Sequence, residues 1–138
     1  MIIKRVALLA VVLLGACASS GANLAPDDMN IRASELTKLS AAVEAYVRYD
    51  DPAPGMSQDD VLQAATKGQP QLLSGFSGLK LKVLSQDRHA VLLVCDKDGT
   101  RALLEDAGCT GKMDIRHWET RDVPCRFTVS VQEVCRPK

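Results

Sequence analysis

Apolar and polar positions divide the chain into a helical first half and a strand-rich second half. From Asn30 onward, apolar residues recur at spacings of three and four, which predicts an amphipathic helix. The run Asp50–Gly55, with two prolines and a glycine, is expected to end it. The predicted inward-facing residues are Leu36, Leu39, Val43, Tyr46 and Val47, and the predicted outward-facing ones are Glu35, Lys38, Glu44 and Arg48.

A second, shorter helix is predicted after Ser57. Ser57 can cap its first turn, Asp60 places a negative charge near the positive end of the helix, and Gly68 ends it. A further short turn is expected at Leu72–Leu73, before the loop Ser74–Gly78. The residues expected to face inward from the second helix are Val61, Leu62 and Ala65.

The next stretch shows the two-residue period of β-strands. Leucine and valine alternate with lysine over residues 79–83, which predicts a half-buried strand. The unbroken apolar run 90–95 predicts a central strand covered on both faces. A turn at Asp96–Gly99 leads into residues 100–105, which suit a returning strand and would serve nearly as well in a helix.

Two further strands are predicted near the C-terminus. Residues 112–118 form the weaker one, and residues 126–131 show the cleanest alternation, with Phe127, Val129 and Val131 on one side. Together these elements predict an α+β fold, in which one or two N-terminal helices pack on an antiparallel sheet of about four or five strands.

The first sixteen residues have the layout of a signal peptide. Lys4 and Arg5 precede the apolar run Val6–Leu14, and two small residues stand before Cys17. The apolar run is nine residues long, whereas a membrane-spanning helix needs roughly 20 apolar residues. The pattern therefore favours a cleaved signal over a transmembrane helix.

The sequence Leu14-Gly15-Ala16-Cys17 resembles the lipobox of bacterial lipoproteins. The resemblance covers only the first seventeen or so residues. It implies cleavage after residue 16, diacylglycerol on the Cys17 sulfur, usually a third acyl chain on its amine, and a stable anchor in the bilayer. Because Ala18-Ser19 follows Cys17, where an aspartate would imply the inner membrane, the resemblance implies the outer membrane and its periplasmic face.

The mature chain is expected to hold one domain. Residues 17–28 read as a lipidated flexible tether and residues 29–138 as a single small α+β domain. Lys4 and Arg5 leave with the signal peptide, so 17 basic residues become 15 against 17 acidic ones. A slightly negative charge argues against a nucleic-acid partner. Aromatic residues are too few for a stacking platform; they are Trp118, Tyr46, Tyr49, Phe76 and Phe127.

Four cysteines follow Cys17: Cys95, Cys109, Cys125 and Cys135. An even number in an exported chain predicts disulfides, with three possible pairings. If Asp96–Gly99 is a hairpin turn, Cys109 lies about nine residues past the residue opposite Cys95, roughly 30 Å away. Bridged Cα atoms are only about 4.4 to 6.8 Å apart. Cys125 and Cys135 flank one predicted strand and should also be far apart. Both distances exclude the same pairing, which joins Cys95 to Cys109 and Cys125 to Cys135.

A hairpin turning near residues 119–124 would place Cys109 about opposite Cys135. The predicted disulfides are therefore Cys109 with Cys135 and Cys95 with Cys125. A helix at residues 100–107 would instead restore the excluded pairing.

The sequence predicts neither a zinc site nor a calcium site. Four cysteines with His89 and His117 lack the paired spacings of zinc sites. The run Asp96–Gly99 with Glu105 resembles a calcium loop, but Val94 occupies the position of the first carboxylate, so a turn is expected instead. No cofactor is expected either, since no glycine-rich phosphate loop occurs.

Candidate catalytic residues are few. Ser74–Gly78 lacks the G-x-S-x-G spacing of a nucleophile elbow. His117 beside Trp118 could act as a general base near a binding wall, with a neighbouring carboxylate such as Asp114.

We therefore expect a non-catalytic envelope lipoprotein that binds a protein partner in the envelope. One alternative is a periplasmic small-ligand binder or minor hydrolase that uses the His117/Trp118 region. The other is a purely structural lipoprotein.

Overall fold

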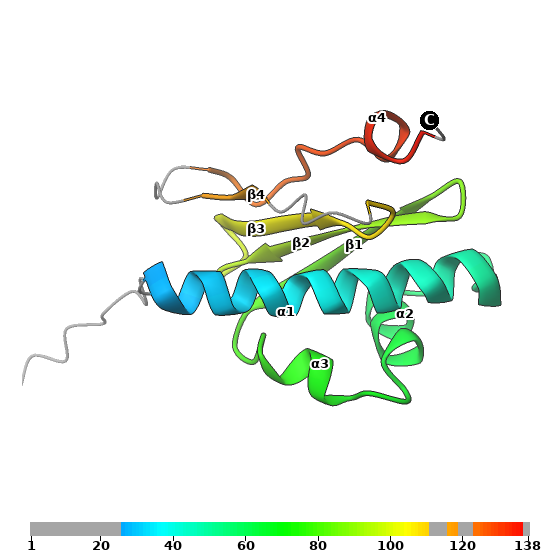
Figure 1. Ribbon diagram of the computed structural model, residues 1–138, viewed down its shortest axis with the longest axis horizontal. Helices are drawn as coiled ribbons and strands as arrows, with labels where there is room; N and C mark the ends of the chain where they lie inside the picture. Colours follow the sequence, from blue (N-terminus) through cyan, green and yellow to red (C-terminus); the bar gives the residue numbers. More distant parts are fainter. Residues whose placement is uncertain (1–25, 111–115, 119–122, 137–138) are drawn as a thin grey trace, which may run out of the picture.

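Three layers make up the described part of the chain, residues 26–110, 116–118 and 123–136 of a computed structural model. The helical layer contains α1 (Pro26–Ala45), its π-helical extension η1 (Tyr46–Asp50), α2 (Gln58–Ala65) and α3 (Gln71–Ser74). The antiparallel sheet has the order β1 (Lys80–Gln86), β2 (His89–Cys95), β3 (Ala102–Ala107) and β4 (Arg116–His117). Residues 123–136, which we call the C-terminal strap, contain α4 (Val131–Val134) and lie on the side of the sheet opposite α1 (Figure 1). The predicted α+β fold with helices on an antiparallel sheet is confirmed.

Helix α1 begins at Pro26 instead of Asn30, so the last three residues of the predicted tether are helical. Proline suits the first turn, because a backbone N–H there has no partner within the helix. The helix widens into η1 and ends at Asp51, which has a φ of 51° and precedes Pro52. Since a following proline disfavours helical backbone, the predicted stop at this run is confirmed.

The buried face of α1 is wider than its apolar stripe. Leu36, Leu39 and Val43 are fully buried, as predicted. The prediction that Glu44 faces solvent is wrong, because only 6% of it is exposed. Its carboxylate accepts a hydrogen bond of 2.7 Å from the Ala90 N–H. Such bonds offset the cost of burying a charge, which the apolar pattern alone does not register.

The second and third helices follow the predicted signals. The Ser57 hydroxyl accepts a hydrogen bond from the Asp60 N–H at 3.2 Å, which caps α2. Val61 and Leu62 are buried beneath it, and Leu72 and Leu73 of the short α3 turn pack on the same core.

Strand β2 is the covered central strand that the apolar run predicts. It pairs with β1 on one side and β3 on the other, and residues 90–95 are completely buried. Its side chains alternate between two cores. Ala90, Leu92 and Val94 pack with the helices, while Val91, Leu93 and Cys95 belong to clusters that include strap residues.

The two hairpins of the sheet have different turns. Asp87 and Arg88 both have positive φ, the geometry of a tight two-residue turn between β1 and β2. Between β2 and β3 the predicted turn at Asp96–Gly99 forms, with Gly99 at a φ of 75°. The chain then returns as β3, so the helical alternative for residues 100–107 is wrong.

The strand predicted over residues 126–131 is wrong. The segment buries Val129 and Val131 as the alternation suggests, but its Thr128 and Val129 N–H groups donate to the side chain of Glu105 instead of a neighbouring strand. Val131 then begins α4. The alternation of apolar and polar residues correctly indicated which side chains are buried. An extended segment that crosses a sheet face shows the same alternation as a strand, so the pattern could not tell the two apart. Of the weaker strand predicted at residues 112–118, β4 forms in the described part, and residues 111–115 lie outside it.

Both predicted disulfides form. Cys95 is bonded to Cys125 with a Cα–Cα distance of 5.7 Å, and Cys109 is bonded to Cys135 with a Cα–Cα distance of 5.5 Å. Each joins the sheet side of the chain to the strap. Most of the hairpin turn expected at residues 119–124 lies outside the described residues, as do Cys17 and Asp114.

Candidate functional site

The carboxylate of Glu105 joins β3 to the strap. Glu105 is fully buried and lies opposite Leu93, on the strap face of the sheet. One carboxylate oxygen accepts hydrogen bonds from the N–H groups of Thr128 at 2.7 Å and Val129 at 3.0 Å, and the other accepts one from the Thr128 hydroxyl. These charge-assisted bonds fix the position of the strap.

The carboxylate of Asp96 organises the β2–β3 turn. It accepts hydrogen bonds from the Thr100 N–H at 2.7 Å, the Thr100 hydroxyl at 2.9 Å and the Arg101 guanidinium at 3.0 Å. Burial by itself would raise the pKa of Asp96, but the bonds from the backbone N–H groups of Arg101 and Thr100, the Thr100 hydroxyl and the Arg101 side chain lower it to about 2. Asp96 and Glu105 thus bind this chain's own donors, and the predicted turn is confirmed.

Replacing Asp96 by Asn should make the protein less stable in a pH-dependent way. The pKa of Asp96 lies below its ordinary value of 3.8, so its contribution is present above that pH and is lost as the pH falls toward about 2. The wild type should exceed Asp96→Asn by on the order of 1 kcal/mol in unfolding free energy near neutral pH. Urea unfolding across this range measures the difference. Asp98→Asn, in the same turn, is the control, and an Asp96→Asn effect that does not change with pH would contradict the assignment.

The structure separates the sequence candidates His117 and Trp118. His117 is exposed on β4, next to Leu104 of β3. Trp118 is half-buried and packs against the cluster of Leu93, Cys95 and Ala102. The indole is therefore part of the strap-side core instead of an open binding wall.

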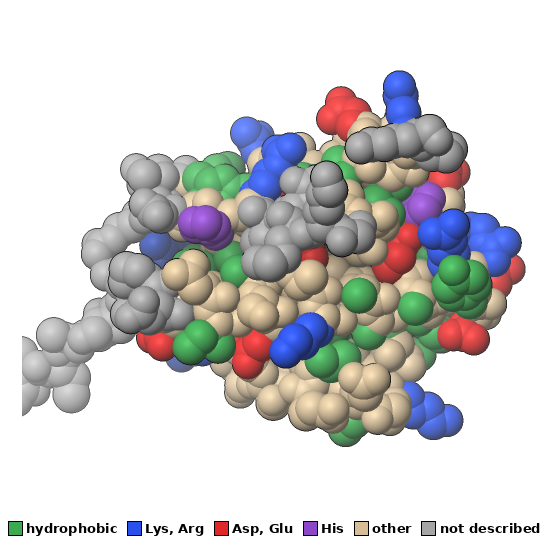
Figure 2. Space-filling model, in the orientation of Figure 1, with side chains coloured by type: hydrophobic (Ala, Val, Ile, Leu, Met, Phe, Trp, Pro, Cys, Tyr) green, Lys and Arg blue, Asp and Glu red, His purple; other side chains and the backbone are tan. Residues whose placement is uncertain are grey.

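Sequence reasoning missed a cluster built around His89, at the start of β2. His89 Nδ1 lies 2.5 Å from Glu44 Oε1. A ring nitrogen of His89 also lies within 4.8 Å of the sulfurs of Cys109 and Cys135. Figure 2 shows histidine side chains at both ends of the visible face, with basic side chains gathered near one of them. No local signal points to Glu44, because Ser40, the buried residue four positions before it, is itself polar.

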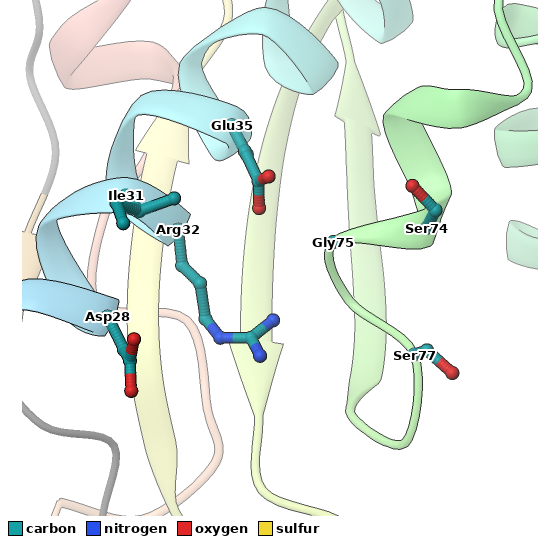
Figure 3. A pocket seen from close by; sticks show the side chains of 7 residues that line it. All are labelled: Asp28, Ile31, Arg32, Glu35, Ser74, Gly75 and Ser77. Carbon is teal, nitrogen blue, oxygen red and sulfur yellow. The ribbon is translucent and has the colours of Figure 1, made fainter.

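A hollow of about 220 Å³ lies beside the N-terminal end of α1. Figure 3 shows the Arg32 side chain extending from α1 into the space in front of the loop with Ser74, Gly75 and Ser77. The Arg32 Nε atom is buried and has no hydrogen-bond partner among the described residues. The Glu35 carboxylate fits against Gly75 so closely that a Cβ atom there would lie 2.1 Å from Glu35 Oε2. The hollow is therefore lined by an arginine whose Nε–H is covered and unpaired within the part of the chain that the structure describes.

Comparisons with known proteins give no relative from which a role could be transferred. No protein-family model, curated protein or solved structure matches the chain. Among the described residues, no helix combines the length and the apolar character required to cross a membrane.

Proposed function

We propose that this protein is a non-catalytic lipoprotein of the cell envelope, anchored through Cys17 in the outer membrane, which binds an envelope protein on its periplasmic side. The observation that carries the proposal is how the chain uses three of its buried or half-buried carboxylates. Glu44 and Glu105 accept hydrogen bonds from backbone N–H groups of distant segments of this chain, and Asp96 accepts one from the backbone N–H of Thr100 in its own turn. Groups employed in this way hold a fold together and are not free for acid–base chemistry on a substrate.

The anchor is supported by the lipobox resemblance at Leu14–Cys17 and by the two disulfides. Disulfides persist in oxidising compartments such as the periplasm. Helix α1 begins nine residues after Cys17, and nine residues extend to about 30 Å at most. The N-terminal end of α1 would thus stay close to the bilayer, where anchoring raises the effective concentration of membrane-bound partners.

The hollow at this end of α1 is the proposed contact surface. Ile31, at its edge, is 59% exposed, and Arg32 offers the unpaired Nε donor. An apolar side chain beside the half-buried arginine fits a partner that presents an apolar residue next to a carboxylate or a backbone carbonyl. Such an acceptor would pair with the Arg32 guanidinium.

Site-specific photo-crosslinking in intact cells tests this proposal. A crosslinking residue in place of Asp28, on the rim of the hollow, should give one discrete protein adduct. The same residue in place of Asp50, at the other end of the helical segment, should give none. Ile31→Ser with Arg32→Gln should abolish the Asp28 adduct, and Cys17→Ser should release the protein from the membrane fraction.

Three results would overturn the proposal. One is equal adducts from positions 28 and 50, and another is an adduct that survives the Ile31/Arg32 double substitution. The third is an unmodified Cys17 in the intact mass of the native protein, which would remove the anchor.

A further inference from the structure

The Cys109–Cys135 disulfide differs from its counterpart in what surrounds it. Both cysteines are half-buried, and a hollow of about 350 Å³ is lined by Cys135 together with His89, Asp87 and Arg136. By contrast, Cys95 of the other disulfide is completely buried in an apolar cluster with Leu93 and Ala102. A nucleophile from solvent can therefore approach Cys135 through this hollow, whereas in the other disulfide Cys125 is half-buried and Cys95 is completely buried.

The imidazole of His89 is held in place beside the accessible disulfide. Its Nδ1 is bound to Glu44, and the other Glu44 oxygen is fixed by the Ala90 N–H. One ring nitrogen lies within 4.8 Å of both sulfurs. The charged groups around this position are Glu44 from α1, Asp87 from the β1–β2 turn and Arg136 from the strap. A cationic imidazole or guanidinium next to a sulfur stabilises the thiolate that forms when a disulfide opens.

We propose that Cys109–Cys135 is a redox-active disulfide that oxidises dithiols, with His89 as a positioning and charge-stabilising residue. A thiolate of the dithiol attacks Cys135 Sγ, a mixed disulfide forms, and the electron pair of the broken bond leaves on Cys109 Sγ, next to His89. The second thiolate of the dithiol then attacks the first sulfur of the same dithiol, which is bonded to Cys135 Sγ in the mixed disulfide. The new bond makes the dithiol a disulfide, and Cys135 leaves as a thiolate. The dithiol loses two electrons and becomes a disulfide, while Cys109 and Cys135 gain two electrons and bind its two protons.

The fold is built to survive this exchange. The Cys135 end of the strap follows α4, whereas Cys95–Cys125 and the Glu105 hydrogen bonds hold the strap further toward its start. Opening Cys109–Cys135 therefore leaves the strap fastened to the sheet by the other disulfide, by the Glu105 hydrogen bonds and by backbone hydrogen bonds of Val123 and Cys125. Each oxidised chain oxidises one dithiol, and this stoichiometric exchange is independent of the non-catalytic protein-binding role proposed above.

The test follows both disulfides in the same sample of the full mature protein. The protein is treated with graded dithiothreitol, free thiols are alkylated, and peptide mapping reports the fraction of each disulfide that has opened. We expect Cys109–Cys135 to open at least about tenfold faster than Cys95–Cys125, with the far-ultraviolet circular dichroism unchanged. His89→Asn should slow the opening of Cys109–Cys135 about tenfold, and His117→Asn should leave it unchanged.

The result is expressed as the ratio of the opening rate of Cys109–Cys135 to that of Cys95–Cys125. Global unfolding of a destabilised variant exposes both disulfides together, so it cannot by itself produce selective slowing of Cys109–Cys135. Simultaneous opening of the two disulfides in the wild type would overturn the proposal. A His89→Asn variant whose ratio equals that of the wild type would also overturn it.

Discussion

Replacing Glu105 by Ala should lower the free energy of unfolding by about 3 to 4 kcal/mol. The substitution removes the acceptor for two backbone N–H groups and one hydroxyl of Thr128 and Val129, and these donors lie against a buried sheet face. A buried donor without a partner costs about 1 to 3 kcal/mol, and the bonds lost here are charge-assisted. Urea unfolding with both disulfides intact measures the loss.

Two further variants locate the effect in the carboxylate. Glu105→Gln keeps the shape and one carbonyl oxygen but turns an amide N–H toward donors, so we expect about half the loss. Glu133→Ala, on the exposed side of α4 in the same layer, should change stability by less than about 0.5 kcal/mol. If Glu105→Ala is no more damaging than Glu133→Ala, the strap is not held by this residue.

Replacing Gly108 by Ala should destabilise the protein by about 2 to 3 kcal/mol and lower its melting temperature by about 10 °C. A Cβ atom at this position would lie 2.4 Å from the Ser40 carbonyl oxygen and 2.6 Å from Glu44 Cβ. Because the first contact is with backbone, relief requires α1 to move away from the end of β3. Such a shift would also disturb the Glu44 contact with His89.

Gly68→Ala is the matched control, since no atom in the described part of the chain lies within 4 Å of a Cβ atom at Gly68 and its backbone is not in the positive-φ region. Thermal unfolding followed by circular dichroism compares the two variants. We expect Gly68→Ala to melt within about 2 °C of the wild type or slightly above it. Equal melting temperatures for the two variants would mean that the close approach of α1 to Gly108 does not limit packing.

Periodicity predicted the elements whose burial is purely apolar. The stripe of Leu36, Leu39 and Val43 and the run of residues 90–95 depend on neighbours in sequence, so their positions could be read directly. The turn at Asp96–Gly99 removed one of the three disulfide pairings, because it fixes how far Cys109 lies from Cys95. The choice between the other two depended on a hairpin near residues 119–124, most of which lies outside the described residues. Local pattern and strand geometry were enough for these features.

The buried carboxylates could not be predicted in the same way. Glu44 and Glu105 are stabilised by N–H groups 46 and 23 residues away, and no local pattern announces such partners. The strap shows the same effect, since the alternation of Phe127 and Val129 predicts a strand, whereas the backbone N–H groups of Thr128 and Val129 donate to the Glu105 side chain. Hydrogen bonds between segments that are distant in the sequence determine the burial of these carboxylates and the conformation of the strap.

The candidate site shows why closeness in sequence is a poor guide to closeness in space. His117 and Trp118 are adjacent in the chain, yet one is exposed and the other packs into a core. His89 was weighed with the cysteines only as part of a zinc site, and sequence spacing could not show that the fold gathers it with Cys109 and Cys135.

The two disulfides interlock along the chain, because the first cysteine of the domain is joined to the third and the second to the fourth. Synthesis presents Cys95 and Cys109 before the other two, so oxidation in the order of emergence would link the wrong partners. Reaching the native pairing then requires reshuffling, which is slow without a catalyst. The yield of correctly folded protein in a cell should therefore depend on a disulfide isomerase, while a protease that cuts once between residues 96 and 134 would leave the two fragments covalently joined.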